Sequence, residues 1–120
     1  MRERVTVYFD YVCPFSWRAA ELIALIEKPL GLEVAWEHFS LFQSEHARVA
    51  GENGGAWQLW NEPLDRADKS GCKGLLPFLA SLAARKQGPE AHDAYRLALQ
   101  RANHLRYQPF DFATVTGVAR

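Results

Sequence analysis

The chain has 120 residues, of which 48% are hydrophobic and 23% charged, a composition typical of one ordinary water-soluble globular domain. Its 14 Lys and Arg balance its 14 Asp and Glu, and the absence of a basic run argues against nucleic acid or a membrane surface as a partner. The apolar segment at residues 5–9 is too short for a signal-peptide core or a membrane span, so a cytoplasmic location is expected.

The first part of the chain predicts a strand, a helix and a second strand. Residues 5–9 (VTVYF) are β-branched and aromatic, as in a parallel strand covered on both faces. From Pro14 the apolar residues recur at helical spacing until a proline and a glycine end the pattern. Residues 32–37 alternate between apolar and polar, with two glutamates on the outer face. Residues 1–42 are therefore expected to form a right-handed parallel βαβ unit.

The remainder of the chain is expected to be a long connection followed by helices. Residues 43–73 are rich in Gly, Asn and charge, which favours a connection or lid, with one short helix carrying two tryptophans. Helices are expected at 76–86 and 89–105, and a last one is capped by Asp111, so that residues 74–120 form a helical insertion. The second of these helices is expected to pack through a side of mostly small residues: Ala91, Ala94, Tyr95, Ala98, Ala102 and Leu105.

Cys13 is the main candidate for chemistry. It falls at the N-cap of the first predicted helix, with Pro14 in the first turn, where a thiolate would face free backbone N–H groups and the positive end of the helix dipole. Cysteines at such positions are often nucleophilic. Ser16, one turn along, has a hydroxyl that could donate to the thiolate but cannot close a disulfide. We therefore expect Cys13 to act as a nucleophile, the alternative being an inert capping residue.

Several other residues are candidates with structural alternatives. Phe15 and Trp17 are expected to shape an apolar rim around the Cys13 turn. His38, directly after the second predicted strand, is a candidate for substrate binding, as are Trp57 and Trp60 in the long connection. His38 could instead have a structural or solvated role, and the two tryptophans could instead fill the gap between layers.

Cys72 and Asp10 each allow two interpretations, and no metal site is predicted. Cys72 could resolve a disulfide with Cys13 or be an incidental loop cysteine. Asp10 could cap the turn or oppose the thiolate through its negative charge. The four histidines show no metal-ligand spacing, and two cysteines are too few for a disulfide framework.

Residues 8–17 (YFDYVCPFSW), placed between a strand and a helix, resemble the DsbA-like thioredoxin-fold proteins. That superfamily includes thiol-disulfide oxidoreductases, 2-hydroxychromene-2-carboxylate isomerases and kappa-class glutathione transferases. The resemblance implies an α/β fold with an all-helical insertion and chemistry that involves glutathione or another small thiol. The oxidoreductases carry Cys-Pro-x-Cys, whereas the isomerases and transferases carry Ser-Pro-aromatic-Ser. This chain combines the cysteine of the first motif with the serine of the second.

The mixed motif predicts a monothiol oxidoreductase, in which Cys13 attacks a disulfide and an outside thiol resolves the product. One alternative is a glutathione-dependent isomerase or transferase, in which residue 13 or 16 only stabilises the cofactor's thiolate. Another is a binding module without turnover. The family's second half, with its cis-proline, is not recognised in the sequence. Because two parallel strands make a poor sheet alone, a second copy or a further C-terminal segment is expected to complete it.

Overall fold

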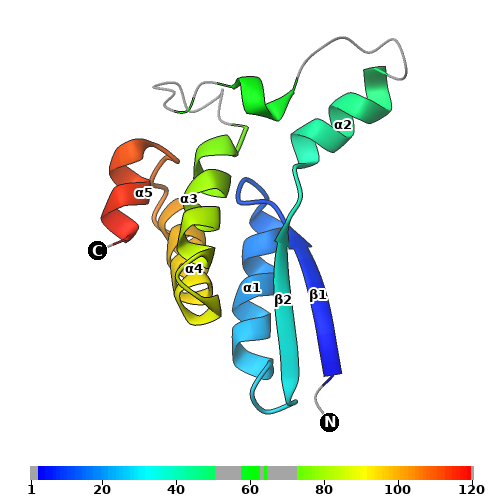
Figure 1. Ribbon diagram of the computed structural model, residues 1–120, viewed down its shortest axis with the longest axis vertical. Helices are drawn as coiled ribbons and strands as arrows, with labels where there is room; N and C mark the ends of the chain where they lie inside the picture. The colour runs from blue at the N-terminus through cyan, green and yellow to red at the C-terminus, as the bar shows by residue number, and fades with distance from the viewer. Residues whose placement is uncertain (1–2, 51–57, 63, 65–72, 120) are drawn as a thin grey trace.

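The computed structural model describes residues 3–50, 58–62, 64 and 73–119. Its elements follow one another along the chain as β1 (Glu3–Phe9), α1 (Pro14–Ile26), β2 (Leu32–His38), α2 (Leu41–Ala50), the short 3-10 helix η2 (Leu59–Asn61), α3 (Leu75–Arg85), α4 (Pro89–His104) and α5 (Phe112–Val118) (Figure 1).

The two strands and α1 form the predicted βαβ unit. β1 and β2 are parallel, with Glu3 opposite Leu32 and Phe9 opposite His38. Pro14 is the first residue of α1, where its missing N–H leaves no hydrogen bond unmade. The chain returns to β2 through Gly31, whose φ of +64° is readily reached only without a side chain. An α/β thioredoxin-like arrangement, consisting of the βαβ unit followed by helices, is thus confirmed.

The strands differ in how well their side chains are covered. On β2 the predicted alternation is present, with Trp36 buried and Glu33 and Glu37 exposed. On β1 the expected cover on both faces is not present, since residues 3–6 are exposed and Tyr8 is 67% exposed. The physical reason is that, in the described part of the chain, β2 is the only strand paired with β1. Among the residues that the structure describes, no strand pairs with the other edge of β1.

The segment after β2 was expected to be a connection from residue 43, and this was wrong for its first part. α2 occupies Leu41–Ala50 and extends from the sheet end away from α1 (Figure 1). Its start is held by two side chains. The Ser40 hydroxyl accepts a hydrogen bond from Gln43 N at 3.1 Å, and the Asp10 carboxylate accepts one from Leu41 N at 2.9 Å. Ser40 was therefore a local helix-start signal within the sequence.

The three C-terminal helices lie within a residue or so of their predicted positions. Asp111 caps α5 as expected, because its carboxylate accepts a hydrogen bond from Thr114 N at 2.8 Å. The predicted inner face of α4 was wrong for Ala94 and Leu105, which are exposed, whereas Ala102 is buried and Tyr95 packs against the core. The buried residues of α4 are mostly polar: His92, Arg96, Leu99, Gln100 and Ala102. Two of them meet partners from other elements, which the sequence of one helix does not reveal: His92 lies beside Ser81 of α3, and Arg96 lies over the ring of Trp36 on β2.

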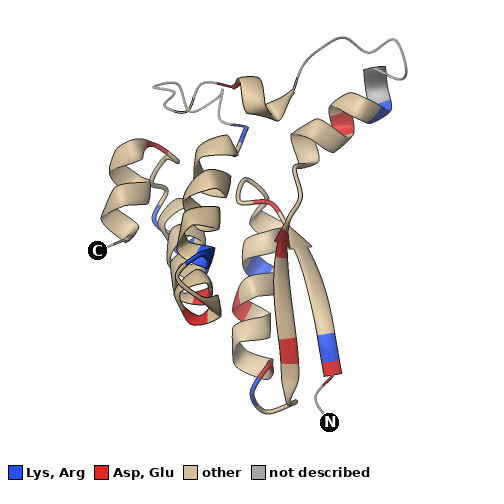
Figure 2. Ribbon diagram, in the orientation of Figure 1, with Lys and Arg blue, Asp and Glu red and all other residues tan. Residues whose placement is uncertain are grey.

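One hydrophobic core joins the βαβ unit to the helices. It is built from the strand ends, the turn after β1 and the helical part, namely Phe9, Tyr11, Ala20, Trp36, Leu76, Leu99, Phe110 and Val115. α4 contacts α1, α3 and α5. Charged residues of both signs are interspersed over these elements (Figure 2). Among the described residues, no helix combines the length and apolar character needed to cross a membrane. The core places the turn between β1 and α1 at the junction of the two parts.

Candidate functional site

The turn that carries Cys13 is closed by backbone hydrogen bonds on both sides. Cys13 is the N-cap of α1, in extended conformation with φ −93° and ψ 116°. Its N–H donates to the Asp10 carbonyl at 3.1 Å, and its own carbonyl accepts from Ser16 N at 3.1 Å. Pro14, with its fixed φ, leads directly into the helix. The structure thus places Cys13 at the N-cap position that the sequence predicted, while interaction of its sulfur with the first amides of α1 stays a prediction.

The Cys13 side chain is a free thiol of intermediate exposure. It makes no side-chain capping hydrogen bond to the helix, so the sulfur is not committed to a structural bond of that kind. Phe15 is 81% exposed and stands out from the turn. The turn therefore carries an exposed apolar ring, and its role as a rim around the Cys13 thiol stays a prediction.

Ser16 is engaged with the backbone of the same turn. Its hydroxyl oxygen accepts a hydrogen bond from Asp10 N at 3.3 Å. An accepting hydroxyl keeps its own proton for a second partner. The predicted donation from Ser16 to the Cys13 sulfur is compatible with this geometry and stays a prediction.

Asp10 acts as a capping residue for the backbone on both sides of the site. One carboxylate oxygen accepts a hydrogen bond from Val12 N at 3.2 Å, and the other accepts from Leu41 N at 2.9 Å. Burial raises the pKa of this carboxyl, and the two backbone hydrogen bonds oppose the rise. Asp10 therefore ties the Cys13 turn to the start of α2.

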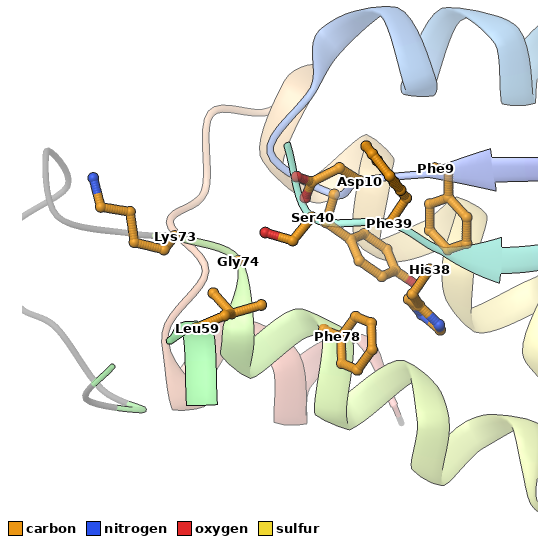
Figure 3. Close-up of a pocket in the computed structure, with 10 residues that line it drawn as sticks. Phe9, Asp10, His38, Phe39, Ser40, Leu59, Lys73, Gly74 and Phe78 are labelled. Atoms are coloured by element: carbon orange, nitrogen blue, oxygen red, sulfur yellow. The ribbon is translucent and has the colours of Figure 1, made fainter. Parts of the chain in front are cut away.

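A small pocket lies beside the turn, with room for about one water molecule. Figure 3 shows the rings of Phe9, His38 and Phe78 gathered on one side, with Asp10 and Ser40 beyond them. The lining residues are Phe9, Asp10, Tyr11, His38, Phe39, Ser40, Leu59, Lys73, Gly74 and Phe78. At this size the pocket does not hold a substrate.

His38 is placed by aromatic contacts at the end of β2. Its ring centroid lies 4.3 Å from that of Phe78, 4.8 Å from that of Phe9 and 5.9 Å from that of His92. Burial, together with the nearby His92 and Arg85, lowers the pKa of His38 to about 4. The imidazole is therefore neutral near pH 7 and packs as an aromatic ring, and substrate binding by His38 stays a prediction.

The structure places one of the two candidate tryptophans. Trp60 lies on η2, 60% exposed, with its ring centroid 5.6 Å from that of Phe78 on the pocket wall. Trp57 lies outside the described residues, and so does Cys72. Trp60 is thus close to the pocket, and its role in binding a substrate remains a prediction.

Trp17 and His104 form a contact that the sequence did not reveal. The two rings stack at 5.9 Å between centroids and 14° between planes. Trp17 Nε1 also donates to Glu21 at 3.1 Å. Glu21 in turn accepts two hydrogen bonds from Arg101, at 2.6 and 2.8 Å. The last turn of α4 therefore packs against and hydrogen-bonds to the first two turns of α1. These residues are about 80 positions apart, so no local sequence pattern predicts the contact.

Two buried hydroxyls and an imidazole form a chain of polar contacts that connects the Cys13 turn to α3 and α4. Tyr11 Oη donates to Ser81 Oγ at 2.6 Å, and Ser81 Oγ lies 3.1 Å from His92 Nε2. Ser81 keeps its own proton while it accepts from Tyr11, and we expect it to donate this proton to His92 Nε2, which requires the His92 tautomer protonated on Nδ1. In the described residues, no three His, Cys, Asp or Glu side chains gather as a metal site would need.

This βαβ unit, with a free cysteine at the start of its helix, defines a thioredoxin-like class of protein. Residues 4–56 match the family model of the DSBA-like thioredoxin domain. The match covers the turn of Cys13 and confirms that the amino-terminal part of the chain is related to these domains, a family of the thiol-disulfide oxidoreductase type. No curated protein matches the chain.

Proposed function

We propose that the protein is a monothiol thiol-disulfide oxidoreductase in which Cys13 is the nucleophile. The observation that carries the proposal is the free, partly exposed thiol at the N-cap of α1, inside the segment that matches the DSBA-like domain. A thiolate at this position faces the first amides of the helix, which favour negative charge. The turn thus offers a nucleophile without a second cysteine one helical turn along.

The proposed reaction has two exchange steps. The Cys13 thiolate attacks one sulfur of a disulfide, forms a mixed disulfide with it and releases the other sulfur as a thiolate. An outside thiolate, such as that of glutathione or another small thiol, then attacks the substrate sulfur of the mixed disulfide. This step oxidises the small thiol, joins it to the substrate sulfur and returns Cys13 to the thiolate.

The neighbouring residues have supporting roles in the proposal. Pro14 sets the turn, and Ser16 donates its free proton to the Cys13 thiolate. Phe15 and Trp17 form the apolar rim, and substrate contacts are assigned to His38, Trp57 and Trp60. A reducing compartment such as the cytoplasm supplies the small thiol that resolves the intermediate.

A specific observation supports a second candidate, a glutathione-dependent isomerase or transferase. The hydroxyl of Ser16 is held over the turn by Asp10 N. A positioned hydroxyl there is what the Ser-Pro-aromatic-Ser motif of those enzymes provides. In that reaction the cofactor's thiolate is the reactive group, and Cys13 is dispensable.

The proposal includes a partner for the sheet. β1 has β2 as its one strand neighbour in the described residues, and Val5 and Tyr8 on it are exposed. A second copy or a further C-terminal segment would pair with the free edge and cover these side chains. Light scattering in solution tests the second copy directly.

The central experiment is incubation with oxidised glutathione, followed by mass measurement of the intact protein. We expect one glutathionyl group on the wild type and on Cys72→Ser, and none on Cys13→Ser in which Cys72 remains. Added reduced glutathione should remove the group. No adduct on Cys13 would contradict the oxidoreductase, and isomerase activity that survives Cys13→Ser would support the second candidate.

A further inference from the structure

We propose that His104 is a positioning residue for the Cys13 turn, through which the helical part of the chain controls the reactivity of the thiol. The inference rests on the proposed role of Cys13 as a reactive thiol. It concerns a residue far away in sequence and on another element.

His104 holds the turn from both sides of Cys13. Its Nε2 lies 2.6 Å from the carbonyl oxygen of Tyr11, two residues before the cysteine. A carbonyl only accepts, so Nε2 carries a proton and donates it. The face of the same ring stacks on Trp17, four residues after the cysteine, with 14° between the planes. One side chain therefore fixes the backbone that precedes Cys13 and the first turn of the helix that follows it.

The ring itself is held in place by its surroundings. Its centroid lies 6.4 Å from that of Phe110, whose ring approaches edge-on at 76°. Arg101, one turn earlier on α4, fixes α1 through its two hydrogen bonds to Glu21. α4 thus presents His104 from a rigid element, so the donor position is set by packing.

The expected consequence is for the thiolate. The positive end of the helix dipole favours an anion at Cys13 more strongly the nearer the sulfur lies to the first amides of α1, so a displacement of the turn changes this electrostatic effect. Without the bond to the Tyr11 carbonyl, the turn gains freedom at the residue that leads into Cys13. Loss of this one hydrogen bond should lower the rate of alkylation of the Cys13 thiol about three- to tenfold.

The test uses the full chain with Cys72→Ser, so that Cys13 is the single thiol, and measures its alkylation by iodoacetamide from pH 5 to 9. His104→Gln keeps an N–H donor near the position of Nε2 and should react within about twofold of the parent. His104→Phe keeps a flat ring against Trp17 without a donor. It should be slower, with the midpoint of its rate profile moved to higher pH. His104→Asn, whose amide is too short to reach the carbonyl, should resemble His104→Phe.

Asp111→Ala is the matched control for general destabilisation, because it removes the cap of α5 without touching the turn. Its alkylation profile should equal that of the parent. The inference is overturned if His104→Phe folds and keeps the alkylation profile of the parent. It is also overturned if the His104→Gln and His104→Asn variants react alike, and this second comparison holds even if the Phe variant does not fold. Failure of the parent to form a mixed disulfide with glutathione would instead count against the proposed function.

Discussion

Tyr11, in the turn before α1, donates its hydroxyl proton to Ser81 on α3 over 2.6 Å, although the two residues are 70 positions apart. Both side chains are fully buried, so neither hydroxyl can exchange this bond for water. Burial also raises the pKa of Tyr11, which keeps the phenol protonated and available as a donor. The bond therefore holds the candidate catalytic turn against the helical part of the chain.

Removing this bond from either side should destabilise the fold by different amounts. Tyr11→Phe leaves Ser81 able to donate to His92, so we expect a loss of about 0.5–1.5 kcal/mol in the free energy of unfolding. Ser81→Ala leaves both Tyr11 Oη and His92 Nε2 buried without Ser81, so a larger loss of about 1–3 kcal/mol is expected. Urea denaturation measures both, and the double variant gives their coupling. Tyr107→Phe, at an 82% exposed tyrosine, is the control and should be neutral. Equal effects of Tyr11→Phe and Tyr107→Phe would contradict the role of the bond.

Gly74 should resist substitution because the chain passes close to Asp10 there. A Cβ at Gly74 would lie 3.2 Å from Asp10 Oδ1 and 3.3 Å from Val12 Cγ1, at a φ of +89°. Gly31 has a similar φ of +64°, but nothing lies within 4 Å of its Cβ position. Gly31→Ala should therefore cost about 1–2 kcal/mol for the backbone alone. Gly74→Ala should cost more, because Asp10 or Val12 must also shift. Equal melting temperatures of the two variants would show that Asp10 and Val12 can move away from a Cβ at position 74 without a measurable cost.

Acid should destabilise the protein through its buried histidines. Burial lowers the pKa of His38 to about 4 and that of His92 below its usual value, helped by the positive charges of Arg85 and Arg96, while Asp93 and Glu37 oppose the shift at His92. The unfolded chain then binds more protons than the folded one below about pH 6.5, so stability is complete above that pH and falls toward pH 4.

Urea midpoints between pH 7.5 and 4.5 test this dependence. His92→Gln, which keeps an acceptor for Ser81 but does not titrate, should flatten the curve. The raised pKa of Asp10 has the opposite sign, because a carboxyl that binds its proton more readily in the fold adds stability as pH falls. A wild-type midpoint that is constant or rises on acidification would contradict the assignment to histidine.

What could be predicted from the sequence was local. Cys13 and Pro14 mark the start of α1, Asp111 caps α5, and the alternation around Trp36 marks β2, because each signal lies within a few residues of its effect. The α2 helix was missed because its apolar residues Leu41 and Phe42 are exposed, so no buried stripe marks it. The Ser40 cap was the remaining signal.

What could not be predicted depends on partners from distant elements. His92 and Gln100 are polar and would normally face solvent, yet both are buried on α4. His92 is buried because Ser81 of α3 meets it. In the same way, His104 became a candidate only when α4 was seen to end beside the Cys13 turn. Sequence spacing within one helix contains no information about such contacts.

The buried Arg96 gives the last prediction. Its guanidinium carbon lies 3.5 Å from the centroid of the Trp36 ring, while its bonds to Gln100 and Asp93 are long, at 3.4 and 3.5 Å. Its Nε is buried and has no hydrogen-bond partner in the described structure, and burial lowers the pKa of Arg96. The charge is therefore poorly compensated by hydrogen bonds and ion pairs, and we expect much of the side chain's contribution to stability to come from the stacking of its guanidinium on the Trp36 ring.

Arg96→Met, which keeps the length without the charge, should change the free energy of unfolding by less than about 1 kcal/mol or raise it. Arg96→Lys should cost about 1–3 kcal/mol, because a compact ammonium stays buried and cannot cover the ring face. Arg96→Ala should cost a similar amount by leaving a cavity over Trp36. Asp93 is half exposed, so water can solvate its carboxylate in the variants that lack Arg96. The control is Arg85→Met, which removes a partly exposed ion pair with Glu37. Urea denaturation ranks the variants, and a Met variant as unstable as the Ala variant would show that the charge, and not the packing, holds this part of the core.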